Sequence, residues 1–268
     1  DKLNYYVDKN LKPNDTGGCL NALQLTSKFI SFQKMGKQSG WLFYVPAWNT
    51  SKIDPTTGFV NLFNTNYENT EKAKEFINNF NNIKYNNKEE YFEFEFDYSL
   101  FSAKAEGTIN KWTICSYGDR VLTFRNELKN NTWDNKIIKL TPEWQALCNK
   151  FKIDFKSGNL KSDFLMQTSS QFYKEFLQLF KLTLQMRNSI TNSDVDYLIS
   201  PVKNLSGKFY DSRMANEYEP KDADANGAYN IGRKGLWVIE QIKKAADLRK
   251  LNLAISNKEW LNFAQRNR

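Results

Sequence analysis

The stretch that most constrains the fold is "EYFEFEFDY" at residues 90–98, in which aromatic and acidic side chains alternate. A period of two predicts a β-strand that places Phe92, Phe94 and Phe96 on one face and the acidic side chains on the other. One apolar face and one polar face are typical of a half-buried strand in an antiparallel sheet. The chain has 268 residues, of which 40% are apolar and 15% aromatic, so it can bury a core against this face.

Periodicity and turn residues predict other elements on both sides of this strand. They are a strand buried on both faces at 40–47, a helix at 70–80, a hairpin at 111–126 that turns at 117–120, a helix at 161–186, a strand at 194–202 that Pro201 ends, and a last helix with a capping box of Ser256 and Glu259. The two ends of the chain have an α/β character, and the middle reads as an insertion. We therefore expect the two ends to come together as one α/β unit.

Aromatic and basic residues alternate within the predicted hairpin. Trp112, Tyr117 and Phe124 lie near Arg120 and Arg125 in the sequence. Aromatic residues beside cations can line a path for single-stranded nucleic acid by stacking on its bases. Aromatic residues in a hairpin are more often part of its core, and this interpretation is the favoured one.

Charge and cysteine content limit the classes of function. The formal net charge is +8, with most of the excess in the C-terminal quarter, which suits a polyanionic partner without requiring one. The three cysteines form no C-x-x-C pair and the chain has no histidine, which disfavours a disulfide framework or a zinc site and indicates a reducing compartment. The longest apolar run, "WLFYVPAW", is too short for a membrane helix.

Two aspartates pose the main functional question. Asp222 and Asp224 stand just before a helical pattern with an apolar stripe of Ala228, Ile231, Gly235, Val238, Ile242 and Ala245. An aspartate at a helix start can simply accept hydrogen bonds from free backbone N–H groups and face the positive end of the helix dipole. The alternative is that a carboxylate there is a hard-oxygen ligand for Mg²⁺, beside small residues that let a phosphodiester approach.

A second polar pair lies in "LQMRNSITNSDVDYLISPV". Arg187 is predicted at the end of a helix, and Asp196 is predicted to open a strand. The simplest interpretation is a surface ion pair that contributes less than about 1 kcal/mol. The functional alternative is an arginine that contacts a phosphate and is positioned by the aspartate.

Six strings occur in an order that identifies a resemblance: "TSKIDPTTGFVN", "YFEFEFDY", "LQMRNS", "DYLISPV", "FYDSR" and "DADANGAYNIGRKGL". Along essentially the whole chain, they resemble the C-terminal part of the type V-A CRISPR RNA-guided DNA endonucleases, the Cpf family. The resemblance implies an α/β fold, an incomplete RNase H-like RuvC portion with an inserted α+β Nuc domain. Residues 1–60 would be the tail of the second RuvC segment, 61–215 the Nuc domain and 216–268 the third RuvC segment.

The same resemblance implies roles for three residues. Asp224 would be the third acidic ligand of a RuvC site that holds two Mg²⁺ ions, which activate water and stabilise the leaving oxygen. Arg187 would match a Nuc arginine that cleavage needs and that positions or neutralises the DNA strand, and Asp196 would match its acidic neighbour. The other two RuvC carboxylates would lie upstream of Asp1. We therefore expect a piece of a longer protein that does not cleave DNA alone.

The implied partners are a guide RNA (crRNA), the target and non-target DNA strands and the rest of the effector protein. No membrane is implied as a partner, and the implied location is the cytoplasm of a bacterium or archaeon. Two departures from the family pattern are Asn230, where members often have His, and Asp54, where some have Cys. The main alternative is a non-catalytic nucleic-acid-binding or assembly module whose acidic pair caps a helix. A transposon-encoded RuvC nuclease is disfavoured because the usual four-cysteine zinc element is absent from the sequence.

Overall fold

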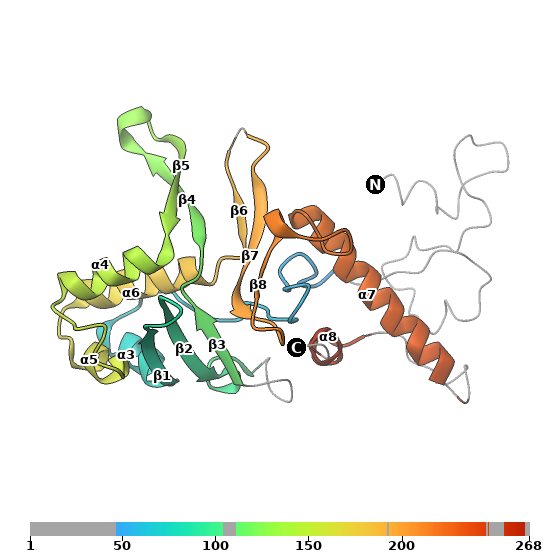
Figure 1. Ribbon diagram of the computed structural model, residues 1–268, viewed down its shortest axis with the longest axis horizontal. Coiled ribbons are helices and arrows are strands. Elements are labelled where there is room, and N and C mark those ends of the chain that lie inside the picture. Colours follow the sequence, from blue (N-terminus) through green and yellow to red (C-terminus); the bar gives the residue numbers. More distant parts are fainter. Residues whose placement is uncertain (1–46, 104–110, 192, 245, 247–254, 266–268) are drawn as a thin grey trace.

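Figure 1 shows a computed structural model of the chain, which describes residues 47–103, 111–191, 193–244, 246 and 255–265. Almost all of the strand predicted at 40–47 lies outside these residues. The described part is a mixed α/β structure with three small antiparallel sheets. Within it, no helix combines the length and apolar character that crossing a membrane demands.

The first sheet is built around the strand with alternating phenylalanines. It has the order β1 (Phe80–Asn86), β2 (Tyr91–Asp97) and β3 (Lys111–Cys115), and all pairs are antiparallel. Phe92, Phe94 and Phe96 are buried, which confirms the prediction of one apolar face. The helices that pack around this core are α3 (Thr70–Asn78), α4 (Leu140–Lys150), α5 (Leu160–Met166) and α6 (Ser170–Thr183).

The predicted hairpin at 111–126 is wrong, because its two strands belong to different sheets. β3 pairs with β2, and β4 (Asp119–Asn126) pairs with β5 (Thr132–Lys139). Trp112 and Ile114 of β3 join the phenylalanine core, whereas residues 122–125 of β4 are exposed. Apolar complementarity to β2 therefore decides the partner of β3. The chain leaves the first sheet at Gly118, whose φ of +78° lies in the left-handed region that glycine adopts freely.

The helix predicted at 161–186 is interrupted. Helix α5 ends at Met166, Gln167 has extended backbone angles (φ −62°, ψ 141°), and α6 begins at Ser170. The hydroxyl of Tyr173 donates hydrogen bonds to the carbonyls of Phe164 (3.0 Å) and Gln167 (2.8 Å). A buried side chain of α6 therefore binds carbonyl groups at the end of α5, and the break has a stable structure.

The third sheet has the order β6 (Arg187–Ser189), β7 (Asp196–Lys203) and β8 (Phe209–Asp211). Strand β7 continues past Pro201, so the prediction that this proline ends the strand is wrong. The register of β7 with β8 shifts between Ile199 and Lys203, and the proline falls inside this irregular stretch, where its missing N–H costs little. Short 3₁₀ turns complete the described elements: Tyr98–Leu100, Glu127–Lys129 and Ser212–Met214.

The C-terminal helices pack against the loop that begins the described chain. A small apolar cluster joins Ile53 and Val60 to α7 (Ala223–Lys244) and α8 (Asn257–Ala264). The predicted capping box of Ser256 and Glu259 at the start of α8 is confirmed.

The loop before the first sheet makes close contacts in two directions. Asp54 is buried, accepts hydrogen bonds from the backbone N–H groups of Thr56 and Thr57, and also accepts one from the hydroxyl of Ser200 in β7. Gly58 has a φ of +73°, and a Cβ there would lie 2.5 Å from the carbonyl of Ala264 in α8. This loop therefore connects the third sheet to the C-terminal helices.

Helix α7 buries part of the predicted apolar stripe and also a polar stripe that was not predicted. Gly235 and Val238 of the predicted stripe are buried, whereas Ala228, Ile231 and Ile242 are exposed, and Ala245 lies outside the described residues. The polar stripe is made of Asn226, Asn230 and Lys234, which follow each other at four-residue steps and are nearly inaccessible to solvent. All three donate hydrogen bonds to backbone carbonyls of the loop over residues 48–53.

Candidate functional site

Arg187 and Asp196 form a bidentate ion pair at the open edge of the third sheet. Arg187 opens β6 and does not end a helix, because α6 already ends at Thr183; Asp196 opens β7 as predicted. Arg187 Nε lies 3.0 Å from Asp196 Oδ1, and Nη2 lies 3.1 Å from Oδ2. The arginine side chain is 55% exposed, and among the described residues its Nη1 has no partner. The pair thus presents an oriented guanidinium with free donors to solvent.

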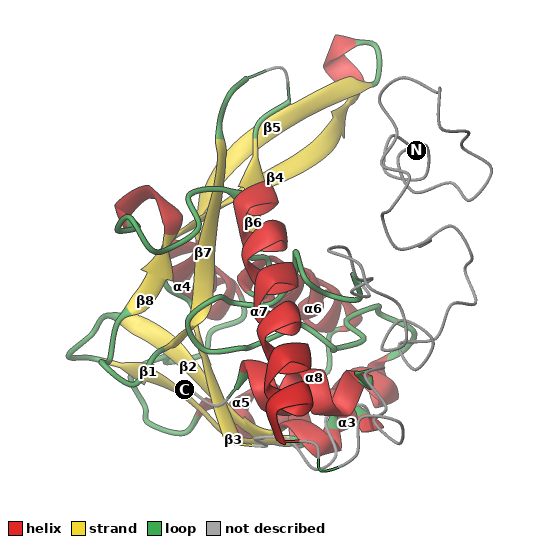
Figure 2. Cartoon of the chain, turned by 90° about the vertical axis from the view of Figure 1, so that its right-hand side faces the viewer, coloured by secondary structure: helices red, strands yellow, loops and turns green. Residues whose placement is uncertain are grey.

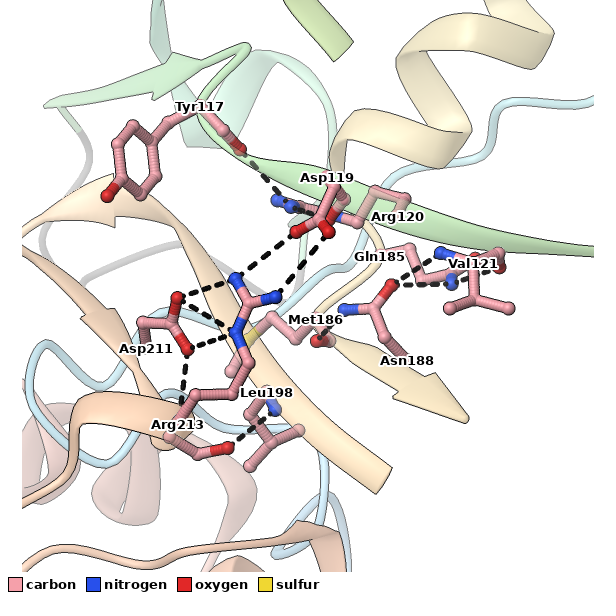
Figure 3. A network of polar contacts seen from close by, with 11 residues as sticks. Tyr117, Asp119, Arg120, Val121, Gln185, Met186, Asn188, Leu198, Asp211 and Arg213 are labelled. Atoms are coloured by element: carbon pink, nitrogen blue, oxygen red, sulfur yellow. Dashed lines mark hydrogen bonds and ion pairs between the residues drawn. The ribbon is translucent and has the colours of Figure 1, made fainter. Parts of the chain in front are cut away.

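Two buried amides hold the strand that carries Arg187. Asn188 Oδ1 accepts a hydrogen bond from the backbone N–H of Val121 (2.9 Å), and Gln185 Nε2 donates to the carbonyl of Val121 (2.9 Å). Asn188 Nδ2 also donates to the carbonyl of Met186 (2.9 Å). Figure 3 shows these side chains between β4 and β6. They bind the backbone N–H and the carbonyl of Val121, although β4 and β6 do not pair in a β-ladder. These contacts therefore fix β4 and β6 to each other.

An ion-pair cluster on the neighbouring surface joins three segments of the chain (Figure 3). Arg213 Nη2 lies 2.8 Å from Asp211 and 3.2 Å from Asp119, and its guanidinium covers the ring of Tyr197 at 4.3 Å. Hydrogen bonds with Asp211, and then with Asp119, raise the pKa of Arg213 above its usual value. Sequence reasoning gave these residues no role; the string "FYDSR" was their only signal, and Asp119 lies far from it in the chain.

Arg120 is fully buried beneath this cluster. Its guanidinium donates to the carbonyls of Tyr117, Asp119 and Thr183, and its Nε has no partner among the described residues. Burial lowers the pKa of Arg120 to about 10, so the side chain remains charged at neutral pH. Arg120 is therefore a structural residue, and it cannot contact a nucleic acid strand.

The predicted aromatic path divides into buried and exposed residues. Trp112 belongs to the core, and Tyr117 stacks on Phe209 with ring centroids 4.0 Å apart. Phe124 and Arg125 are instead exposed on β4. The interpretation as a core is right for Trp112 and wrong for Phe124, because β4 leaves the first sheet.

The two aspartates at the start of α7 have different environments. Asp222 is the cap, because its Oδ1 accepts a 2.7 Å hydrogen bond from the backbone N–H of Ala225. Asp224 lies in the first turn, is exposed, and makes no hydrogen bond or ion pair with another described residue. The capping interpretation therefore explains Asp222, whereas Asp224 faces the positive end of the helix dipole from the first turn and keeps its carboxylate accessible.

The Arg187–Asp196 pair and Asp224 belong to segments that pack against each other. In the β6–β7 ladder, Arg187 is paired with Leu198. Leu198 is buried in a cluster that includes Ala223, the residue before Asp224. Paired residues in an antiparallel ladder point to the same face of the sheet. The residue opposite Arg187 thus packs against the first turn of α7, and Figure 2 shows α7 beside β6 and β7.

These residues do not complete a metal site by themselves. No group of three or more His, Cys, Asp or Glu side chains that could hold a metal ion occurs in the described part of the chain. The carboxylate of Asp224 is a hard-oxygen donor of the kind that Mg²⁺ prefers, and it is accessible. Asp224 can therefore contribute one ligand to a site whose other ligands come from elsewhere.

A comparison with protein-family models gives one match that fits this geometry. The model described as "NUC: Nuclease domain" matches residues 53–214, which is more than half of the chain. The matched range contains the first and third sheets, the arm of β4 and β5, and both members of the Arg187–Asp196 pair. Helix α7 with Asp224 follows it.

Proposed function

The chain belongs to the nuclease-domain family whose model covers residues 53–214, and from this premise we propose that it is the C-terminal RuvC/Nuc portion of a type V-A CRISPR RNA-guided DNA endonuclease. In this proposal, a guide RNA selects the DNA by base pairing, and this portion helps to cut the target and non-target strands. The ordered strings of the sequence support the identification, and the rest of the effector protein would complete the cutting site.

The observation that carries the proposal is the arrangement of three side chains. Asp224 is an exposed carboxylate without a hydrogen-bond partner among the described residues, and its helix start packs against the residue paired with Arg187. Arg187 presents free guanidinium donors and is oriented by Asp196. An oriented arginine and an accessible carboxylate on segments that pack together suit a phosphodiester, because the arginine binds the phosphate and the carboxylate can hold a cation.

The proposed cofactor is Mg²⁺, with Asp224 as one ligand and carboxylates from outside this chain as the others. The chemistry that Mg²⁺ supplies in such a site is activation of water and stabilisation of the leaving oxygen. The residues of this chain would do the remaining work. Arg187 would neutralise and position the strand, Asp196 would hold the guanidinium plane, and Asn188 would fix the strand that carries Arg187.

The experiment that tests the proposal compares two neighbouring aspartates in the full-length parent protein with its guide RNA and Mg²⁺. We expect Asp224→Ala to abolish cutting of guide-matched DNA while DNA binding stays at the wild-type level. Asp222→Ala is the matched control, since it removes the helix cap and should leave most of the cutting. Equal cutting by wild type and Asp224→Ala would show that Asp224 is not a metal ligand.

The same assay separates cutting from assembly. Asp196→Asn keeps the size of the side chain but weakens the ion pair, so it should reduce cutting less than Arg187→Ala does. The purified 268-residue chain should bind nucleic acid and not cut it with Mg²⁺ present. Cutting by this chain alone would contradict the need for outside carboxylates. Unchanged cutting by both the Arg187 and the Asp224 variants would favour a non-catalytic binding or assembly module.

A further inference from the structure

We propose that the β4–β5 arm, residues 119–139, is a contact surface for single-stranded nucleic acid, with Trp133 and Arg125 as its stacking platform. The inference rests on the proposed function only in taking nucleic acid as the ligand. It adds a binding surface that is separate from the carboxylate and arginine proposed for cutting.

The arm is a two-stranded ribbon that extends away from the rest of the molecule in both Figure 1 and Figure 2. Its ladder runs from Asp119 paired with Lys139 to Asn126 paired with Thr132, and no further described strand joins it. An isolated ribbon of two strands is only marginally stable in water. Large apolar side chains are exposed on both faces of the ribbon and at its tip: Leu122, Phe124, Leu128, Trp133 and Ile137.

The outer half of the arm carries a preformed stack of a cation on an aromatic ring. Arg125 and Trp133 are paired across the ladder, and the guanidinium carbon lies 4.5 Å from the centre of the indole ring. Arg125 Nη1 also donates a 2.9 Å hydrogen bond to the carbonyl of Asn131, which holds the guanidinium in place. Trp133 is 56% exposed. A flat, exposed pair of this kind can stack on any nucleobase, whatever the sequence.

The charges of the arm favour a polyanion over an apolar protein partner. Arg125, Lys136 and Lys139 are exposed. Of the arm's three carboxylates, Asp119 pairs with Arg213, and Glu127 and Asp134 are the other two. Residues 119–139 contain five Lys and Arg residues against three Asp and Glu residues, so the arm has a small excess of positive charge, and its exposed cations can neutralise phosphates and release counterions.

A groove connects the arm to the strand that carries Arg187. Its volume is about 1000 Å³, and its lining includes Thr123 of β4, Lys181 of α6 and Arg187 of β6. Thr123 lies two residues before Arg125 and so shares its face of the ribbon. A single strand of nucleic acid bound to the arm can follow this groove toward Arg187. The amide contacts of Asn188 and Gln185 with Val121 fix the base of the arm to β6.

The test measures binding of a fluorescently labelled oligothymidylate of about 20 nucleotides to the 268-residue chain by anisotropy, with EDTA present so that no cutting can occur. We expect Trp133→Ala to raise Kd about tenfold, because stacking on one aromatic residue has an effect of this order. Trp133→Phe retains an aromatic face and should stay within about threefold of wild type. The matched control is Leu205→Ala, which removes a 77% exposed apolar side chain from the turn between β7 and β8, outside the arm, and should leave Kd unchanged.

Arg125→Ala gives an independent measurement that does not depend on the integrity of the indole. It should weaken binding. It should also reduce the slope of log Kd against the logarithm of the salt concentration by the amount that corresponds to about one phosphate contact. A Kd for Trp133→Ala within twofold of wild type would overturn the proposal, and so would a Trp133→Phe variant as weak as Trp133→Ala. The assay contains no metal and measures binding alone, so its result does not depend on the metal-ligand role proposed for Asp224. Failure of the arm is therefore distinguishable from failure of the proposed cutting site.

Discussion

The body around the first sheet and the C-terminal region around α7 are held together by different interactions. In the body, aromatic side chains from β1, β2, β3 and four helices form one apolar core. In the C-terminal region, the apolar cluster is small, and the long helix α7 is attached mainly through Asn226, Asn230 and Lys234, which donate to backbone carbonyls. The same helix leaves Leu236, Ile239 and Ile242 exposed.

This difference shows that the two halves of the candidate site have unequal support. Arg187 and Asp196 belong to strands that are fixed to the body, whereas Asp224 stands on the helix with polar attachment. An apolar core contributes stability in proportion to the area it buries and spreads it over many side chains, whereas a hydrogen bond to a fixed carbonyl depends on one donor, and its loss leaves a buried acceptor unsatisfied. The location of Asp224 is therefore more sensitive to single polar changes than that of Arg187.

The largest effect should come from the centre of the body. Phe94 is fully buried between Trp144 and Phe180, with ring centroids 4.8 and 5.3 Å away. Phe94→Ala should lower the free energy of unfolding by about 3–5 kcal/mol, because it removes buried area and leaves a cavity. Urea denaturation measures the loss. The matched control is Phe124→Ala on the arm, which should cost less than about 1 kcal/mol; equal losses would contradict the division between body and arm.

A pH effect of nearly the same size should come from Lys234. Burial lowers the pKa of Lys234 to about 8, from the value of 10.5 that it has in the unfolded chain. Between these two values the unfolded chain holds a proton that the folded chain has lost, so unfolding takes up a proton and becomes less favourable as pH rises. Stability should increase across this window by up to about 3 kcal/mol.

Lys234→Met removes the titrating group and supplies the comparison for this pH effect. The difference in unfolding free energy between wild type and the variant should be constant below pH 8 and should then shift toward wild type as pH rises. Thermal denaturation at closely spaced pH values measures it. Parallel profiles for the two proteins would show that the buried stripe of α7 carries no titrating charge.

A smaller effect should come from the amides of α7. Asn230 Nδ2 donates to the carbonyls of Thr50 (2.9 Å) and Ile53 (3.2 Å), and Asn230→Ala leaves both carbonyls without this donor. We expect a loss of about 2 kcal/mol that is confined to the C-terminal region. Hydrogen exchange should accelerate in α7 and stay unchanged in β2. Asn81→Ala, at an exposed asparagine of β1, is the matched control and should leave exchange in α7 unchanged. Faster exchange in β2 of the Asn230→Ala variant would contradict the separation of the two regions.

The smallest effect on stability should come from the ion pair that is proposed to matter most for activity. Arg187 is 55% exposed, so Arg187→Ala and Asp196→Ala should each change the free energy of unfolding by less than about 1 kcal/mol. A double-mutant cycle in urea measures the coupling between them. A large coupling would assign the pair to the architecture of the third sheet, and a small one agrees with a role in contacting a ligand.

The amino-acid sequence by itself determined the features that depend on neighbours along the chain. The alternation at 90–98 predicted the buried face of β2, the pattern at 70–80 predicted α3, and Ser256 with Glu259 predicted the start of α8. Local periodicity and capping fix such features because they involve backbone groups and side chains only a few residues apart. The resemblance to a known family also singled out Arg187, Asp196 and Asp224, without their geometry.

Only the tertiary structure decided which strands pair, which polar groups are buried and which aspartate is free. β3 joined β2 and not β4 because Trp112 and Ile114 complement the phenylalanine face. The buried amide of Asn188 accepts a hydrogen bond from the distant backbone N–H of Val121, and that of Asn230 donates to the distant carbonyl of Thr50. Asp222 and Asp224 have the same chemistry and nearly the same sequence position. Their environments differ because the helix begins at Ala223, so Asp222 caps it and Asp224 lies in its first turn. The local pattern allows either aspartate to be the cap, and the start that the structure adopts is the one that packs Ala223 against Leu198, far away in the chain.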